Sequence, residues 1–145
     1  CITNQPVIAR GDCSYEELHM VNNKLTFLLG IHGAYLDKLY FCPHHPDSGF
    51  EGEIANLKGV CQCRKPSPGM LMEAKEDLNL DLDESWIIGD RTSDIALTDY
   101  FDGFSALVLT GAGGKDGLFF KRKNVNGNKK DGMYHMLPTK MKQSL

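Results

Sequence analysis

The sequence predicts an α/β fold, a Rossmann-like parallel sheet with helices on both faces. Two observations predict it: short apolar segments alternate with amphipathic helical segments, and polar side chains follow the ends of the apolar segments. Strands that alternate with helices pair in parallel, because each crossover helix returns the chain to the same edge of the sheet. Parallel sheets bind ligands beyond the carboxyl ends of their strands. We therefore expect the functional site at that edge.

Three helices are predicted from their first residues. Ser14-Tyr15-Glu16-Glu17 fits a capping box, in which the serine and the glutamate satisfy each other's backbone N–H groups. The apolar residues that follow at helical spacing are Leu18, Val21, Leu25, Leu28 and Leu29. Ser67-Pro68 reads as an N-cap followed by proline at the first helical position. Thr92 or Ser93 can cap the third helix.

Four short apolar segments are expected to be strands. They are the segment ending at Thr3-Asn4, Leu39-Tyr40-Phe41, Trp86-Ile87-Ile88 and Ala106-Leu107-Val108-Leu109. The polar or thiol residues expected at their carboxyl ends are Thr3-Asn4, Cys42, Asp90 and Thr110. Because the first residues read like the end of a buried strand, we expect an N-terminal strand to be missing and the chain to be a fragment or a processed product.

Charge is distributed unevenly along the 145 residues, which are enough for one domain with a core. Residues 121–145 carry seven Lys/Arg and one Asp, a net charge of +6. Since the whole chain has a net charge of −3, residues 1–120 carry −9. We expect residues 1–120 to form the core and residues 121–145 a basic, poorly ordered tail. The acidic body argues against nucleic-acid binding. No apolar run reaches the ~20 residues of a membrane span, and we expect a cytoplasmic protein.

Two short motifs predict a metal site. Cys42-Pro43-His44 and Cys61-Gln62-Cys63 supply three thiols and one imidazole, the donor set of closed tetrahedral zinc sites. Soft thiolates favour zinc over magnesium or calcium. The alternative is buried free cysteines beside a chance histidine, but the Pro- and Gly-rich surroundings would make a poor core. Residues 42–63 are therefore expected to be a zinc-stapled loop.

The remaining cysteines and the second histidine are not needed for this site. An odd number of five cysteines does not suggest a disulfide framework. Cys1 and Cys13 have no partner in spacing, and His45 is expected to point elsewhere. A closed zinc site has no open position to activate water, so its expected role is to fix the loop and the direction of Arg64 and Lys65, which follow it.

A second constellation suits phosphate chemistry. The hydroxyl of Thr3 and the amide of Asn4 can hold phosphate oxygens, and Lys65 brings a compact positive charge. Asp90 follows a strand and Gly89, and its carboxylate suits magnesium. Phosphoryl transfer needs mainly positioning and neutralisation of oxygen charge. Each residue alone is weak, since a strand-terminal Gly-Asp is common, but they converge on one sheet edge.

Longer segments resemble the haloacid dehalogenase-type phosphatases. They are Ile2-Thr3-Asn4-Gln5 with Ile8-Ala9-Arg10-Gly11, Cys42-Pro43-His44-His45-Pro46-Asp47, Cys61-x-Cys63-Arg64-Lys65-Pro66-x-Pro68-Gly69-Met70, and Ile88-Gly89-Asp90. The resemblance covers roughly residues 1–114. The closest branch is the D-glycero-D-manno-heptose 1,7-bisphosphate phosphatases, with the histidinol-phosphate phosphatases beside it.

The resemblance implies Mg²⁺-dependent hydrolysis of a phosphate monoester on a small sugar phosphate, through an aspartyl-phosphate. The expected substrate is the heptose 1,7-bisphosphate, losing its 7-phosphate. Phosphate or substrate contacts are implied for Thr3, Asn4, Arg10, Arg64 and Lys65. Lys65 and Asp90 are implied as catalytic positions, with Asp90 as the magnesium ligand. The implied structural zinc ligands are Cys42, His44, Cys61 and Cys63.

Two departures from the family pattern bear on activity. The family's Asp-x-Asp motif, which supplies the nucleophile, should precede Thr3 and is absent, while Asp81-Leu82-Asp83 lies in the wrong order. We expect this chain alone to be inactive and the intact protein to be active. Pro6-Val7 resembles a variant found in fusions to a sugar nucleotidyltransferase. The alternatives are a histidinol-phosphate phosphatase and a non-catalytic zinc-stapled binding module, and a monomer is expected.

Overall fold

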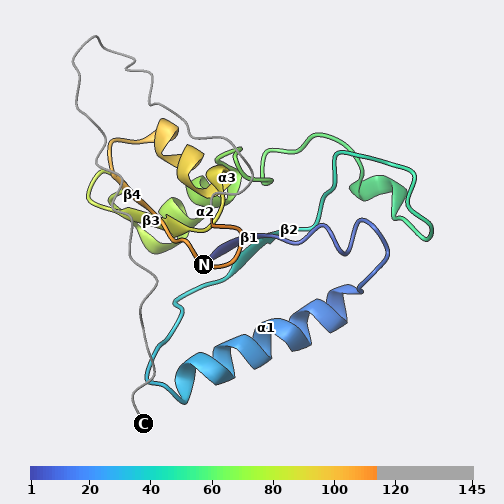
Figure 1. Cartoon of the computed structure of the whole chain (residues 1–145), viewed down its shortest axis with the longest axis horizontal. Helices are drawn as coiled ribbons and strands as arrows, with labels where there is room; N and C mark the ends of the chain where they lie inside the picture. Colours follow the sequence, from blue (N-terminus) through green and yellow to red (C-terminus); the bar gives the residue numbers. More distant parts are fainter. Residues whose placement is uncertain (114–145) are drawn as a thin grey trace. The chain divides into compact units, whose positions relative to one another are not determined.

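The computed structural model describes residues 1–113 (Figure 1). The predicted tail at residues 121–145 lies outside this described part. The helices and strands in chain order are β1 (Ile2–Asn4), α1 (Tyr15–Gly30), β2 (Tyr40–Cys42), the 3₁₀ helix η1 (Ala55–Leu57), α2 (Gly69–Leu78), β3 (Trp86–Gly89), α3 (Thr92–Ile95), the 3₁₀ helix η2 (Ala96–Tyr100) and β4 (Phe104–Leu107).

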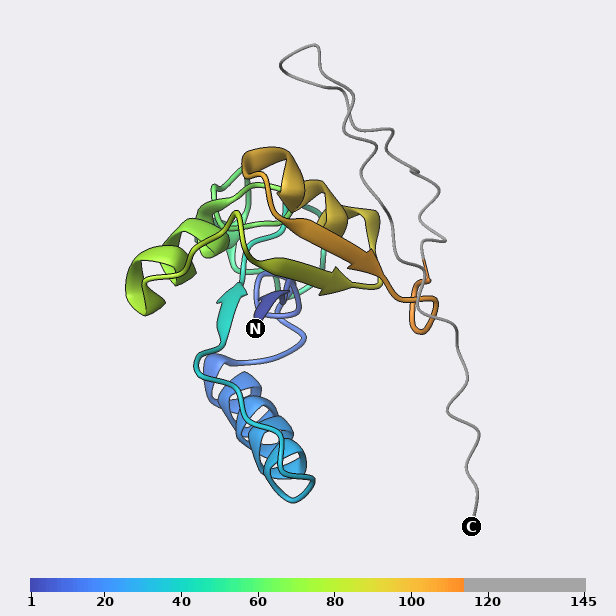
Figure 2. The ribbon, with the colours of Figure 1, turned by 90° about the vertical axis from the view of Figure 1, so that its left-hand side faces the viewer.

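The described chain divides into two compact units, Cys1–Ala74 and the residues from Lys75 onward. The first unit contains β1 and β2, which pair in parallel with Asn4 opposite Cys42. The second contains β3 and β4, which also pair in parallel, with Gly89 opposite Leu107 (Figure 2). Helix α1 connects the first pair, and α3 with η2 connects the second. The predicted alternation of strands and helices with parallel pairing is confirmed.

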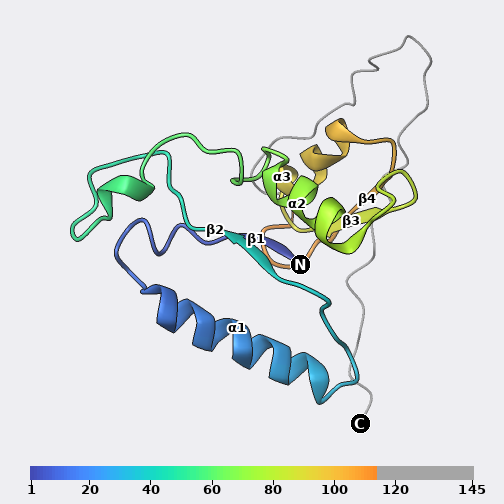
Figure 3. The same cartoon turned by 180° about the vertical axis from the view of Figure 1, so that it is seen from behind.

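Helix α1 begins where the sequence predicts, because the capping box of Ser14 and Glu17 forms. The hydroxyl Oγ of Ser14 accepts from the N–H of Glu17 at 3.1 Å, and Oε2 of Glu17 accepts from the N–H of Ser14 at 2.8 Å. Of the apolar residues at helical spacing, only Leu18 is buried within the described part of the chain. Figure 3 shows the helix from behind, with the chain beyond Gly30 returning to β2. The capping box therefore accounts for where the helix begins.

The other two helices begin differently from the sequence prediction. The carbonyl of Pro68 accepts the first helical bond of α2 from Met72, so Gly69 and not Pro68 is the first helical residue. In α3 the N-cap is Arg91, whose N–H donates to Oδ2 of Asp94 at 3.0 Å. The prediction that Thr92 or Ser93 caps this helix is wrong. A carboxylate three residues into the helix performs the capping instead.

Each unit has its own buried residues. In the first, Tyr40, Cys42, Met70 and Ala74 form a cluster, against which Ile2, Cys61 and Cys63 pack. In the second, the largest fully buried side chain is Leu97. The last predicted strand begins two residues early, at Phe104, and Leu109 is 39% exposed. No helix in the described residues is both long and apolar enough to span a bilayer.

Candidate metal and phosphate site

The four predicted metal ligands come together in the first unit. Their ligand atoms, three Sγ and one histidine nitrogen, all lie within 4.8 Å of one another. The Sγ atoms are 3.1 Å (Cys42–Cys63), 3.4 Å (Cys61–Cys63) and 3.6 Å (Cys42–Cys61) apart. Nδ1 of His44 lies 3.3 Å from Cys63 Sγ and 3.7 Å from Cys42 Sγ. Tetrahedral zinc with Zn–S bonds near 2.3 Å needs Sγ atoms roughly 3.8 Å apart, so the donor set fits such an ion with small adjustments.

The thiols of this cluster have unequal protonation tendencies. Burial raises the pKa of the Cys42 thiol, and its hydrogen bond with Cys63 raises it further. Burial also raises the pKa of Cys63. For Cys61 burial acts in the same direction, but hydrogen bonds from Cys63 and from the Arg64 backbone outweigh it and lower the pKa. The raised pKa values of Cys42 and Cys63 favour protonated thiols, whereas a bound divalent cation would favour three thiolates.

The residues excluded from the metal site lie apart from it. The ring of His45 accepts from the N–H of Asp47 at 3.0 Å and meets the ring of Phe50 edge-on at 5.0 Å. It contributes no atom to the four-ligand group, as predicted. Cys1 is exposed, and Cys13 is partly exposed with its Sγ on the Ser14 carbonyl at 3.3 Å.

Asn4 and Lys65 are joined although they lie 61 residues apart. The side-chain Nδ2 of Asn4 donates to the Lys65 carbonyl at 3.1 Å, and the Lys65 N–H donates to Oδ1 of Asn4 at 3.0 Å. The ammonium Nζ of Lys65 donates to the Ile2 carbonyl at 2.8 Å. The sequence predicts these residues at one site, and the structure places Lys65 at the carboxyl end of β1.

Thr3 and Arg64 extend this group. Oγ1 of Thr3 accepts from Nε2 of Gln5 at 3.3 Å, so the hydroxyl hydrogen of Thr3 remains available to donate. Nη1 of Arg64 donates to the carbonyl of His44 at 3.1 Å, which ties the arginine to a metal ligand. This contact supports the expectation that the metal loop fixes the direction of Arg64.

Arg10 lies on the turn that follows β1. Its Nε pairs with Oδ2 of Asp12 at 2.7 Å, and the arginine side chain is 29% exposed. The described contacts do not join it to Lys65 or Arg64. The substrate role predicted for Arg10 stays a prediction.

Asp90 lies in the second unit, directly after β3. Its Oδ2 accepts from the N–H of Ala112 at 2.7 Å. Gly111 has a φ of +62°, and a Cβ there would overlap Oδ2 of Asp90, so the close approach requires glycine. The turn after β4 thus fixes the orientation of Asp90, and a carboxylate has further lone pairs for a hard cation.

Known proteins resemble most of the described chain. Residues 62–125 match the HAD-hydrolase-like family. A D-glycero-beta-D-manno-heptose-1,7-bisphosphate 7-phosphatase from Yersinia pestis is 40% identical over 111 residues, covering 76% of this chain and 57% of that protein. The enzyme of the same name from Escherichia coli (strain K12) is 36% identical, with coverages of 76% and 56%.

A solved structure agrees with these sequence matches. It is the D,D-heptose 1.7-bisphosphate phosphatase from B. bronchiseptica, complexed with magnesium and phosphate. It superposes with a TM-score of 0.64 at 32% identity, covering 77% of this chain and 56% of that one. The chain is similar to the haloacid dehalogenase-like hydrolases over most of its described residues. It spans a little more than half the length of these relatives, which carry the name of the heptose bisphosphate branch.

Within this haloacid dehalogenase-like chain, one acidic residue near the proposed magnesium ligand was not predicted. Asp94 is buried and lies four residues after Asp90, where its carboxylate caps α3 and lies against Gly89. The available signal was the spacing itself, Gly-Asp followed by a second aspartate. A buried carboxylate at this position adds negative charge to that end of β3.

Proposed function

We propose that the intact protein is a Mg²⁺-dependent phosphatase of a small sugar phosphate. The proposed substrate is D-glycero-D-manno-heptose 1,7-bisphosphate, which would lose its 7-phosphate. The observation that carries this proposal is the paired contact between Asn4 and Lys65, beside a metal-ligand cluster that also holds Arg64. The names of the relatives support the substrate.

The proposed roles follow from the contacts. The hydroxyl of Thr3 accepts from Gln5 and can donate its hydrogen to a phosphate oxygen. The ammonium of Lys65, held at β1 by the Ile2 carbonyl, would neutralise phosphate charge. Arg64 would contact the remainder of the substrate from its anchor on His44.

Two parts of the proposed chemistry need groups beyond these side chains. Asp90 would hold magnesium, which when bound neutralises charge on the transferring phosphate. An Asp-x-Asp motif preceding Thr3 in the intact protein would supply two groups. One aspartate would attack phosphorus to form an aspartyl-phosphate as the bond to the sugar oxygen breaks, and the other would protonate that oxygen. Water would then hydrolyse the aspartyl-phosphate and release phosphate. Zinc at the four-ligand cluster would be structural.

The test is phosphate release by the intact protein with Mg²⁺. We expect turnover of heptose 1,7-bisphosphate to exceed that of histidinol phosphate, the alternative substrate. A higher kcat/KM for histidinol phosphate would reassign the substrate. No release from any small sugar phosphate would favour the zinc-stapled binding module.

A single variant tests the role of Lys65. Lys65→Met should lower kcat/KM by about 10³-fold, because one preorganised charge contact is removed from the transition state. Lys75→Met, at an exposed position in α2, is the matched control and should leave the rate unchanged. Equal rates for the two variants would contradict the assignment of Lys65.

A further inference from the structure

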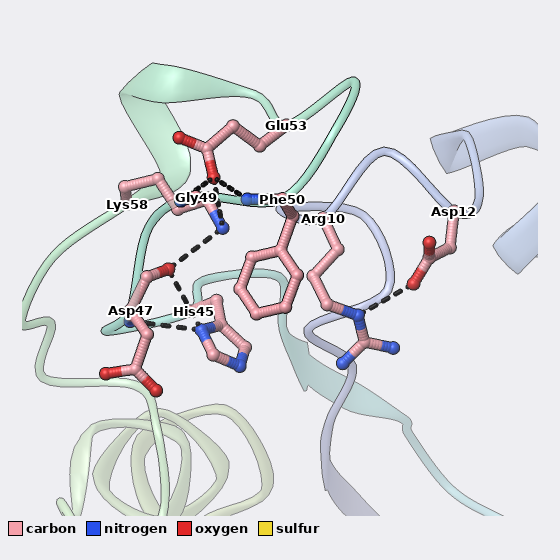
Figure 4. A network of polar contacts seen from close by, with 8 residues as sticks. All are labelled: Arg10, Asp12, His45, Asp47, Gly49, Phe50, Glu53 and Lys58. Carbon is pink, nitrogen blue, oxygen red and sulfur yellow. Dashed lines mark hydrogen bonds and ion pairs between the residues drawn. The ribbon is translucent and has the colours of Figure 1, made fainter.

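The loop between His44 and Cys61 has its own closed polar cluster, distinct from the metal ligands (Figure 4). We call it the loop cluster, and its members are His45, Asp47, Gly49, Phe50, Glu53 and Lys58. Oε2 of Glu53 accepts from the N–H of Gly49 at 2.8 Å, from the N–H of Phe50 at 2.9 Å and from Nζ of Lys58 at 3.2 Å. One carboxylate oxygen thus collects three donors.

Lys58 is the centre of the loop cluster. Its Nζ also donates to the Asp47 carbonyl at 2.9 Å and lies 4.4 Å from the centroid of the Phe50 ring. Its side chain is only 9% exposed, although lysine is ordinarily among the most exposed residues. The backbone N–H of Phe50 is the main cause that lowers the pKa of Glu53, and Lys58 adds to it. The ion pair, the cation–π contact and the amide bonds are mutually supportive.

The loop cluster is directly connected to the turn that carries Arg10. The N–H of Ile54, next to Glu53, donates to the carbonyl of Ala9 at 3.0 Å. The N–H of Ala9 donates in turn to the carbonyl of Pro43, which lies between two metal ligands, at 3.3 Å. Ala9 is fully buried, as is its neighbour Ile8. The residue before Arg10 is therefore held on one side by the metal site and on the other by the loop cluster.

A close backbone approach strengthens this second attachment. Gly11 has a φ of +77°, and a Cβ at this position would overlap the carbonyl oxygen of Gly52. Only glycine allows the turn and the loop to meet this closely. Arg10 is thus flanked by Ala9 and Gly11, both of which contact the loop beside the cluster.

We propose that Glu53 and Lys58 are positioning residues for Arg10, and that the loop cluster sets where this guanidinium meets the part of the substrate remote from the reacting phosphate. This extends the proposed function and rests on it for the role of Arg10. The loop cluster is tied through Ile54 to the turn that carries Arg10. Disturbing it should therefore affect binding of the distal group more than the chemical step.

The first experiment measures the coupling without enzyme activity. In the zinc-loaded protein, Lys58→Met should speed amide hydrogen exchange at Ile54 by about tenfold or more, because the bond from this N–H to the Ala9 carbonyl links the loop to the turn. Lys58→Arg retains the charge and the contact with the Phe50 ring and should restore slow exchange. Glu51→Gln removes a charge from an exposed neighbour outside the cluster and is the matched control.

The outcomes of this experiment are distinguishable. Faster exchange confined to the loop and the turn, with full zinc content, supports the proposal. Unchanged exchange at Ile54 in Lys58→Met overturns it. Loss of zinc or general acceleration in β3 and β4 would mean that Lys58 serves folding as a whole, and this also overturns a specific positioning role.

The second experiment uses the intact active protein. Lys58→Met should raise KM for the sugar bisphosphate roughly 10- to 100-fold while leaving kcat and the turnover of p-nitrophenyl phosphate, which has no distal phosphate, unchanged. Arg10→Ala should give the same profile, and combining the two should add little, since both act through one contact. Additive losses, or equal loss on both substrates, would overturn the proposal. Absence of turnover on every substrate would refute the proposed function, while the exchange result would still decide whether the loop cluster holds the turn.

Discussion

The region of residues 1–74 and the region of β3 and β4 both bury apolar residues, and they differ in the contacts that accompany this burial. In the first, polar and thiol contacts join residues far apart in sequence, such as Asn4 with Lys65 and Cys42 with Cys63. In the second, the parallel strand pair lies over a few buried aliphatic residues, and its contacts are nearer in sequence. The first region, with paired polar groups and a four-residue cluster that could hold a metal ion, should be sensitive to chelation and charge as well as to side-chain volume. The second region should be sensitive mainly to side-chain volume.

The largest effect is expected at the metal site. Cys61→Ser should lower zinc content, loosen residues 44–58 and weaken phosphate binding, because structural zinc contributes about 10 kcal/mol to the folding of small metal sites. Exchange in β3 and β4 should change much less. Zinc by mass spectrometry, phosphate titration and amide exchange measure these effects, with Cys13→Ser as the thiol control. Full zinc content and unchanged phosphate binding in Cys61→Ser would mean that the ligand assignment is wrong.

The opposite test removes volume from the second region. Leu97 is fully buried, so Leu97→Ala should cost about 3 kcal/mol of unfolding free energy and speed exchange in β3 and β4. Leu80→Ala, at a position 36% exposed, should cost far less. Zinc content should stay the same in both. If Leu97→Ala released zinc as readily as Cys61→Ser, the contrast between the two regions would fail.

A smaller and more local effect is expected at Gly111. Gly111→Ala should displace Asp90 and weaken magnesium binding, since the new Cβ would overlap Oδ2 of that carboxylate. Gly33→Ala is the matched control, because Gly33 has a similar φ of +73° but a Cβ added there would have no atom within 4 Å. Both should lose about 1 kcal/mol from backbone strain. Equal magnesium affinity in the two variants, measured by calorimetry on the intact protein, would show that the contact with Asp90 is unimportant.

The smallest effect concerns the cap of α1. Ser14→Ala should cost about 1 kcal/mol, whereas Ser93→Ala should cost little, because Asp94 caps α3. Hydrogen bonds from Ser14 lower the pKa of Glu17. Its contribution is therefore present above its ordinary pKa and lost as pH falls through the lowered value. Denaturant unfolding at neutral and acidic pH measures the free energy of unfolding of both variants and its dependence on Glu17. A large loss of stability in Ser93→Ala would mean that a hydroxyl caps α3 after all.

Local patterns in the sequence were sufficient where the interaction is local. The capping box at Ser14 forms as predicted, and the four residues of the two metal motifs lie together as predicted, because spacing within a few residues fixes each motif. That these residues hold zinc stays a prediction. The cap of α3 was predicted incorrectly. The hydroxyls of Thr92 and Ser93 and the carboxylate of Asp94 could each cap the helix, and the local sequence does not decide among them. The division near Ala74 falls inside α2, which has continuous helical spacing and so gives no sequence signal.

Long-range contacts were predicted only in outline. Asn4 was predicted at the site from the end of its strand, and Lys65 from its position after the metal motif, but their reciprocal hydrogen bonds were not predicted. Around Lys58 the sequence predicts only an irregular loop, because an ion pair, a ring and two backbone amides leave no periodic pattern. Helical spacing predicts α1 but not how much of it is buried, and Val21 is 61% exposed.

The reciprocal pair between Asn4 and Lys65 restricts what evolution can place at position 4. Only a carboxamide offers one donor and one acceptor in the geometry of a backbone peptide, so aspartate would lose the donor and serine would be too short. The same side chain is also proposed to bind phosphate. Position 4 is therefore constrained both by the contact with Lys65 and by phosphate binding. New substrate preferences should arise instead at sites such as Arg10, whose side chain bonds only locally to Asp12 in the contacts described above.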